Sequence, residues 1–207
     1  MRIVVVACLG VALAAAAWGF AGRASGAEEK TAKAQCAQLG GWQRLANRVD
    51  AVVFCPSWMP DPLVPQIGNR WNNINSVDPD RSYLQSFAWQ EAAGLNTLEI
   101  HVNLRGYPGT TRIPTCQDVS TVNGKTYRKK IACFQDPQGT WRSSTTGINA
   151  TMYTVNHGAD SWHVLFAWRR NGSLYTISEH VAPPLSYAKV VTNLKRMIDR
   201  LVLVKPS

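Results

Sequence analysis

The fold class of this 207-residue chain is decided by SWHVLFAWRRNGSLYTISEH, residues 161–180, in which two runs rich in strand formers flank Asn171-Gly172. This dipeptide favours the positive φ angles of a two-residue type I′ turn. The turn sets a register with Arg170 opposite Ser173, and it gives the hairpin one apolar face. That face carries Trp162, Val164, Phe166, Trp168, Tyr175 and Ile177, with Trp168 opposite Tyr175, Phe166 opposite Ile177 and Val164 opposite Glu179. A slip of one residue would turn this whole set to the other face, so the register should be strongly specified.

Further strands and helices are predicted on both sides of this hairpin. Strands are predicted at 51–54, 81–90, 97–104 and 148–155, with a second hairpin at 119–122 and 126–134 around Asn123-Gly124. Helices are predicted at 28–39, 42–49 and 187–203, the last one capped by Ser186, and loops at 63–80 and 135–147. The order indicates an α+β fold, in which an antiparallel sheet of hairpins carries an N-terminal helix and a C-terminal amphipathic helix on one face.

The start of the chain is typical of a secretory signal. Arg2 precedes an apolar run, and Ser25-Gly26-Ala27 offers small residues for cleavage after Ala27. We therefore expect a signal peptide at 1–27 and a single domain at 28–207, with no transmembrane span after cleavage. The alternative is a retained membrane anchor, because an apolar run of 18 residues is at the lower limit for a span.

The cysteines left after signal removal predict two disulfides. Four cysteines allow three connectivities, and the local pairs Cys36–Cys55 and Cys116–Cys133 are favoured because each closes a short loop. In the predicted second hairpin Cys116 lies opposite Ile131, so the bond to Cys133 needs a bulge or a diagonal reach. A zinc site is the alternative, but no pair has the close spacing of a structural zinc site.

The chain is basic, and its basic residues fall into short runs. Its formal net charge is +9, and removing Arg2 and Arg23 with the signal lowers it to +7. Arg128, Lys129, Lys130, Arg169 and Arg170, beside Trp141 and Trp168, are candidates for binding an anionic polymer. The competing interpretation is that these charges protect exposed strand edges from aggregation.

Two loop tryptophans are candidates for contact with a partner protein. Trp58 lies in a proline-rich loop, and Trp71 follows Arg70 in the predicted loop at 63–80. The alternative for Trp71 is that its ring only anchors this loop to the body.

The sequence offers one constellation of candidate catalytic residues. His157, Asp160 and His163 flank a predicted turn, and His101, Glu179 and His180 could join them in a hydrolase site. Their spacing matches no named metal motif, and the chain has no G-x-S-x-G elbow and no phosphate-binding glycine pattern. We therefore predict no metal and no cofactor, and we favour a non-enzymatic protein over an enzyme.

The layout resembles a bacterial family. A short helix, the loop Phe54-Cys55-Pro56-Ser57-Trp58-Met59-Pro60, the hairpin turn Val122-Asn123-Gly124-Lys125, the strand pair 168–175 and a final helix resemble uncharacterised extracytoplasmic domains that are attached to anti-sigma factors or lipoproteins. The four cysteines depart from that pattern. The resemblance implies a ligand-binding or protein-binding role and supplies no catalytic residue. Together these observations predict a secreted binding or accessory domain at the cell envelope, with an extracytoplasmic hydrolase as the alternative.

Overall fold

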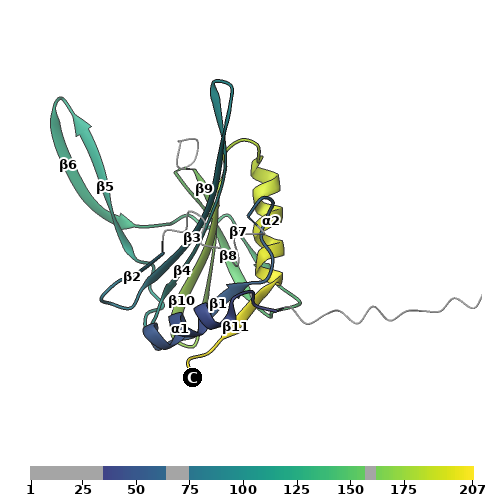
Figure 1. Ribbon diagram of the computed structural model, residues 1–207. Helices are drawn as coiled ribbons and strands as arrows, with labels where there is room; N and C mark the ends of the chain where they lie inside the picture. The colour runs from purple at the N-terminus through teal and green to yellow at the C-terminus, as the bar shows by residue number, and fades with distance from the viewer. Residues whose placement is uncertain (1–34, 64–74, 157–161) are drawn as a thin grey trace, which may run out of the picture. The chain divides into compact units, whose positions relative to one another are not determined.

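The computed structural model describes residues 35–63, 75–156 and 162–207, all of which belong to one unit, Lys33–Ser207 (Figure 1). The predicted signal peptide, Arg70, Trp71, His157 and Asp160 lie outside the described residues. None of the described helices is long and apolar enough to cross a membrane.

A seven-stranded antiparallel sheet forms the centre of the fold, in the strand order β2-β3-β4-β10-β9-β8-β7. Its strands are β2 (Asn75–Val77), β3 (Tyr83–Ala93), β4 (Asn96–Tyr107), β7 (Gly139–Arg142), β8 (Asn149–Val155), β9 (His163–Arg170) and β10 (Ser173–His180). Strands β9 and β10 have the predicted register, with Arg170 opposite Ser173 and Val164 opposite Glu179. The α+β fold expected from the sequence is therefore confirmed.

One face of the sheet is covered by both helices and by a second, two-stranded sheet. Helix α2 (Tyr187–Asp199) begins at the predicted cap Ser186, whose side chain accepts a hydrogen bond from the Lys189 backbone. Helix α1 (Leu39–Val49) packs near β1 (Val53–Pro56), which pairs with β11 (Leu201–Val204). All these elements contribute to one hydrophobic core, in which the Phe54 ring packs nearly perpendicular to the rings of Trp168 and Tyr175.

Several predicted boundaries are wrong. Residues 35–38 are not helical, whereas α1 begins at Leu39 and runs through the two glycines that were expected to interrupt it. The C-terminal helix ends at Asp199, because Leu201–Val204 pairs as a strand with β1. The predicted loops contain strands β2 and β7, and the β3–β4 turn is two residues long, since pairing continues to Ala93 and Asn96.

The second predicted hairpin forms, but it is not part of the large sheet. Strands β5 (Thr115–Val122) and β6 (Lys125–Ala132) make a two-stranded sheet of their own beside the seven-stranded one (Figure 1). Every side chain of this hairpin is exposed except Ile131, which is half-buried. We call residues 115–132 the basic arm.

Both predicted disulfides are present. Cys36 bonds to Cys55 with a Cα–Cα distance of 5.7 Å, and Cys116 bonds to Cys133 at 4.8 Å. Cys116 does lie opposite Ile131, and the bond reaches diagonally to Cys133, just past the end of β6. Two disulfides indicate an oxidising compartment outside the cytoplasm.

Candidate functional site

The face of the sheet that turns away from the helices carries a line of polar side chains. Because β10 pairs with β4 on one side and β9 on the other, residues two apart on these strands face the same way. The residues that share this face are His101, Asn103, Arg105 and Tyr107 of β4, Thr176, Ser178 and His180 of β10, and His163 and Leu165 of β9. Polar groups from three strands therefore meet on one surface.

Three histidines, a glutamate and a serine form a cluster at one end of this surface. The His163 ring stacks on His180 with a centroid separation of 5.0 Å, and it meets the His101 ring edge-on at 5.7 Å. Glu99 Oε1 lies 3.2 Å from His180 Nδ1 and 3.6 Å from His101 Nδ1. Ser86 Oγ lies 2.8 Å from His101 Nε2. We call these five residues the histidine cluster.

The histidine cluster holds one anionic and one neutral group at neutral pH. Burial acts to raise the pKa of Glu99, but the hydrogen bond from Gln90 and the nearby His180 and His101 outweigh it, so the pKa is lowered. Burial lowers the pKa of His101 despite the opposing charge of Glu99. Ser86, neutral His101 and ionised Glu99 thus follow the order of a nucleophile, a general base and a carboxylate, but the 3.6 Å between Glu99 and His101 Nδ1 is too long for an orienting hydrogen bond.

Access argues against that catalytic interpretation. Ser86 is only 1% exposed, so a substrate cannot reach its hydroxyl in this structure. Among the described residues, no group of three His, Cys, Asp or Glu side chains is arranged to hold a metal ion. The hydrogen bond between Ser86 and His101 joins β3 to β4, and Glu99 joins β4 to β10, so the cluster stabilises the pairing of three strands.

The predicted catalytic constellation is divided between the two faces of the sheet. His163 lies with His180 and His101, but Glu179 points into the core, where its Oε1 accepts a hydrogen bond from Asn193 Nδ2 at 3.0 Å. Burial raises the pKa of Glu179 to about 8. The sequence interpretation did not include Ser86 and Glu99, and Glu179 cannot act together with the histidines.

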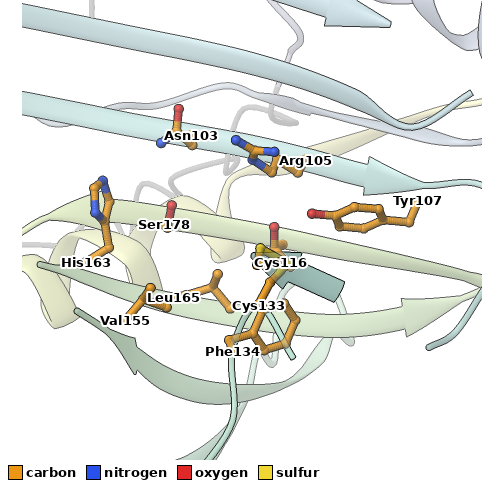
Figure 2. A pocket seen from close by; sticks show the side chains of 11 residues that line it. Asn103, Arg105, Tyr107, Cys116, Cys133, Phe134, Val155, His163, Leu165 and Ser178 are labelled. Carbon is orange, nitrogen blue, oxygen red and sulfur yellow. A yellow bond between two sulfur atoms is a disulfide. The ribbon is translucent and has the colours of Figure 1, made fainter. Parts of the chain in front are cut away.

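An open pocket of about 250 Å³ continues the polar surface away from the histidine cluster (Figure 2). Its polar lining comes from Asn103, Arg105, Tyr107, His163, Thr176 and Ser178, and its apolar lining from Val155, Leu165, Phe134 and the Cys116–Cys133 disulfide. The base of the basic arm therefore forms one wall of this pocket. None of these described lining residues is acidic.

The basic arm presents Arg128, Lys129 and Lys130, three of the candidate binding residues, to solvent. Pairing places Arg128 and Lys130 on one face of the arm, and Lys125 and Lys129 on the other. Asp118, opposite Lys129, is the acidic residue of the arm. Within the described chain these four cations form no ion pair, and Arg128 Nη1 donates a hydrogen bond to Gln117 Oε1.

The second predicted basic run lies at the end of β9. Arg169 and Arg170 are exposed, and Arg169 Nε donates a hydrogen bond to the Thr111 carbonyl oxygen. Trp168 is 3% exposed, so its ring cannot serve as a platform beside them. Trp141 is half-buried and packs against the core.

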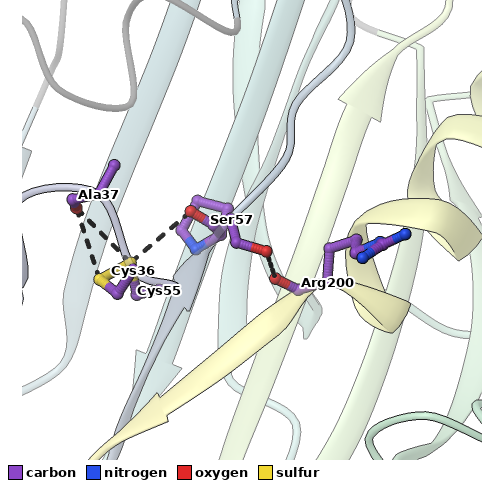
Figure 3. The surroundings of a disulfide bond; sticks show 6 residues. Cys36, Ala37, Cys55, Ser57 and Arg200 are labelled. Atoms are coloured by element: carbon purple, nitrogen blue, oxygen red, sulfur yellow. Dashed lines mark hydrogen bonds between the residues drawn. A yellow bond between two sulfur atoms is a disulfide. The ribbon is translucent and has the colours of Figure 1, made fainter. Parts of the chain in front are cut away.

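The proline-rich loop after β1 is held against the body. Ser57 Oγ donates a hydrogen bond of 2.7 Å to the Arg200 carbonyl oxygen, next to the Cys36–Cys55 disulfide (Figure 3). Trp58 packs against the core, and the Arg196 guanidinium lies 4.1 Å from its ring centroid. The Trp58 ring is thus largely used within the protein, which leaves little of it for a partner.

Comparison with known proteins adds no functional information. No family model, curated protein or solved structure matches the chain. The resemblance to extracytoplasmic domains attached to anti-sigma factors or lipoproteins stays a prediction, and function has to be argued from the pocket and the arm.

Proposed function

We propose that this protein is a secreted, non-enzymatic binding domain of the cell envelope, and that its basic arm binds an anionic polymer. The observation that carries the proposal is the combination of exposure and charge on β5–β6, where four cations and one carboxylate project from a hairpin open on both faces. The two disulfides support a site of action outside the cytoplasm.

The geometry of the arm suits a linear polyanion. Side chains two apart on a strand lie about 7 Å from one another, so Arg128 and Lys130 can meet successive charges along one polymer. Exposed Val119 and Tyr127 add apolar contact area between the cations. Edge protection also explains cations on a two-stranded hairpin, since both of its strands are edges, and binding experiments separate the two explanations.

The test is binding of the purified protein to cell-wall polymers, anionic lipid vesicles and nucleic acid over a range of salt concentrations. We expect affinity to fall steeply with salt, and the triple variant Arg128→Gln/Lys129→Gln/Lys130→Gln to bind weakly with a log–log salt slope reduced by up to about three. The matched control neutralises Arg44, Arg48 and Lys205, which are exposed outside the arm. Equal loss in both triple variants would reduce the effect to net charge, and no binding to any polyanion would refute the proposal in favour of a partner protein.

A hydrolase is the second candidate, and the order of Ser86, His101 and Glu99 is the observation that favours it. We rank it second because Ser86 is buried. Ester hydrolysis that Ser86→Ala and His101→Gln both abolish, with the fold retained by circular dichroism, would reverse this ranking. Activity that survives Ser86→Ala, or no activity at all, leaves the histidine cluster as a structural feature.

A further inference from the structure

The pocket on the open face of the sheet divides into a polar half and an apolar half. The polar half comes from β4 and β10, with Arg105 between Asn103 and Tyr107 along β4, and from His163 of β9 (Figure 2). The apolar half comes from β8, β9 and the segment after β6, through Val155, Leu165 and Phe134. A ligand that fills both halves must itself be amphiphilic.

The charge of the pocket selects the sign of that ligand. Arg105 is a permanent cation, and the described lining residues include no carboxylate to neutralise it. The Tyr107 hydroxyl points toward the Arg105 side chain (Figure 2). Asp78 and Asp80 act electrostatically on Tyr107, but neither lines the pocket. Asn103 and Ser178 supply neutral hydrogen-bonding groups beside the guanidinium.

The apolar half is a built surface and not a chance exposure. Val155 and Leu165 pack against a second hydrophobic cluster, separate from the main core, that contains Phe134 and Tyr153. The centroids of the Phe134 and Tyr153 rings lie 4.9 Å apart. The Cys116–Cys133 disulfide closes this side of the pocket, and it fixes the wall that the base of the arm provides.

We propose that this pocket binds a small organic carboxylate, whose carboxylate pairs with Arg105 and whose apolar part rests on Leu165, Val155 and Phe134. A guanidinium binds a carboxylate through two parallel hydrogen bonds, which favours it over a neutral head group. A volume of about 250 Å³ is below the usual range for drug-sized ligands, so the ligand is a short-chain or single-ring acid. This site is distinct from the cations of the arm, and the proposal does not depend on polymer binding.

The test is calorimetric titration of the purified protein with sodium butanoate, hexanoate, octanoate and benzoate, alongside hexanol, hexylammonium and hexyl phosphate. We expect saturable one-to-one binding of at least one carboxylate, and amide shifts by NMR at 103–107, 163–165 and 176–178. Arg105→Gln should weaken this binding about tenfold or more, because a charge-assisted hydrogen bond is lost. Arg112→Gln is the control, since Arg112 is exposed on the following loop and does not line the pocket.

Other outcomes overturn the proposal. Equal binding of hexanol or hexylammonium, or an unchanged affinity in Arg105→Gln, would show that the pocket does not recognise an anion. Preference for hexyl phosphate would replace the carboxylate by a phosphate ligand, and no saturable binding by any acid would refute the site. Failure of the arm proposal is distinguishable, because neutralising Arg128, Lys129 and Lys130 should leave carboxylate binding intact, whereas Arg105→Gln should leave polymer binding intact.

Discussion

The hairpins β5–β6 and β9–β10 have the same Asn-Gly turn, but the first is exposed and the second is largely buried. Asn123-Gly124 has φ angles of 51° and 73°, and Asn171-Gly172 has 50° and 72°. All four strands have eight residues. Yet every residue of β10 is buried, whereas every residue of β5 is exposed. An Asn-Gly turn therefore determines that two strands pair, and the composition of the strands determines where the hairpin lies.

The strands of the two hairpins differ in the apolar surface that they offer. Strands β9 and β10 supply Phe166, Trp168 and Ile177 to the core. Strands β5 and β6 offer Val119, Val122 and Tyr127, all exposed, among threonines, one serine and cations. An isolated two-stranded hairpin is only marginally stable in water. The arm is covalently closed at its base by Cys116–Cys133, which compensates for the missing core.

Matched aromatic truncations should give the largest difference between the hairpins. Phe166→Ala removes a ring that is 1% exposed, and we expect it to lower the free energy of unfolding by about 3–5 kcal/mol. Tyr127→Ala removes an exposed ring of the arm, and should change the free energy of unfolding by less than about 0.5 kcal/mol. Urea denaturation measures both values, and equal losses would show that the arm packs against the body.

The pH dependence of the free energy of unfolding should change by a few kcal/mol when a carboxylate of the core hairpin is removed, and should not change when a carboxylate of the arm is removed. Burial raises the folded-state pKa of Glu179 to about 8, above the ordinary value of 4.5, so the folded protein holds a proton that the unfolded chain releases. Stability should fall as pH rises from about 4.5 to 8 and then level off. Glu179→Gln, which mimics the neutral acid, should remove this fall and stabilise the protein by at most about 5 kcal/mol at high pH.

The control for that titration is Asp118→Asn in the arm, which removes a carboxylate that touches no part of the core. The pH dependence of thermal unfolding should remain that of the unmodified protein. If the stability of Glu179→Gln instead depends on pH as that of the unmodified protein does, Glu179 ionises in the folded protein at its ordinary pKa.

Removal of the Cys36–Cys55 disulfide should lower global stability, whereas removal of the Cys116–Cys133 disulfide should act mainly on the arm. The loop-entropy argument gives about 3 kcal/mol for either bond, since their sequence separations are 19 and 17. Cys36→Ser/Cys55→Ser should lower global stability by this amount, because Cys55 is fully buried. Cys116→Ser/Cys133→Ser should instead open the arm, seen as rapid amide exchange at 115–132, with a global loss below about 1 kcal/mol. A larger global loss in the second variant would contradict the independence of the arm.

Alanine in the two turns should give the smallest effect. Gly172 and Gly124 both have positive φ angles, and alanine there costs about 1 kcal/mol. We expect Gly172→Ala to lower the global free energy of unfolding by this amount, and Gly124→Ala to change only amide exchange within the arm. Chemical denaturation followed by hydrogen exchange checks both, and a global effect of Gly124→Ala would couple the arm to the core.

The core hairpin was predictable because both of its determinants are local. Asn171-Gly172 fixes the turn, and the alternation of Val164, Phe166 and Trp168 fixes the face. The end of α2 was not predictable in this way, since Leu201 continues the apolar stripe of the helix. Residues 201–204 fit a short buried strand equally well, and the choice depends on β1, near the other end of the described chain.

In the candidate site, too, only what depends on local sequence was predictable. The predicted hairpin register already brings His163 opposite His180. Glu99 joins them only because β4 pairs with β10, and Arg105 reaches the pocket by the same long-range pairing. No local pattern reveals that pairing, so the pocket and the histidine cluster emerge from the tertiary structure.

The position of the Cys116–Cys133 bond also determines what a cut in the arm does to the molecule. A trypsin-like protease meets exposed peptide bonds after Lys125, Arg128, Lys129 and Lys130, all between the two bonded cysteines. A nick at any of them leaves two polypeptides joined by one covalent bond, with the body unaltered. Such a molecule migrates as a single species until it is reduced, and then separates into two fragments at the arm.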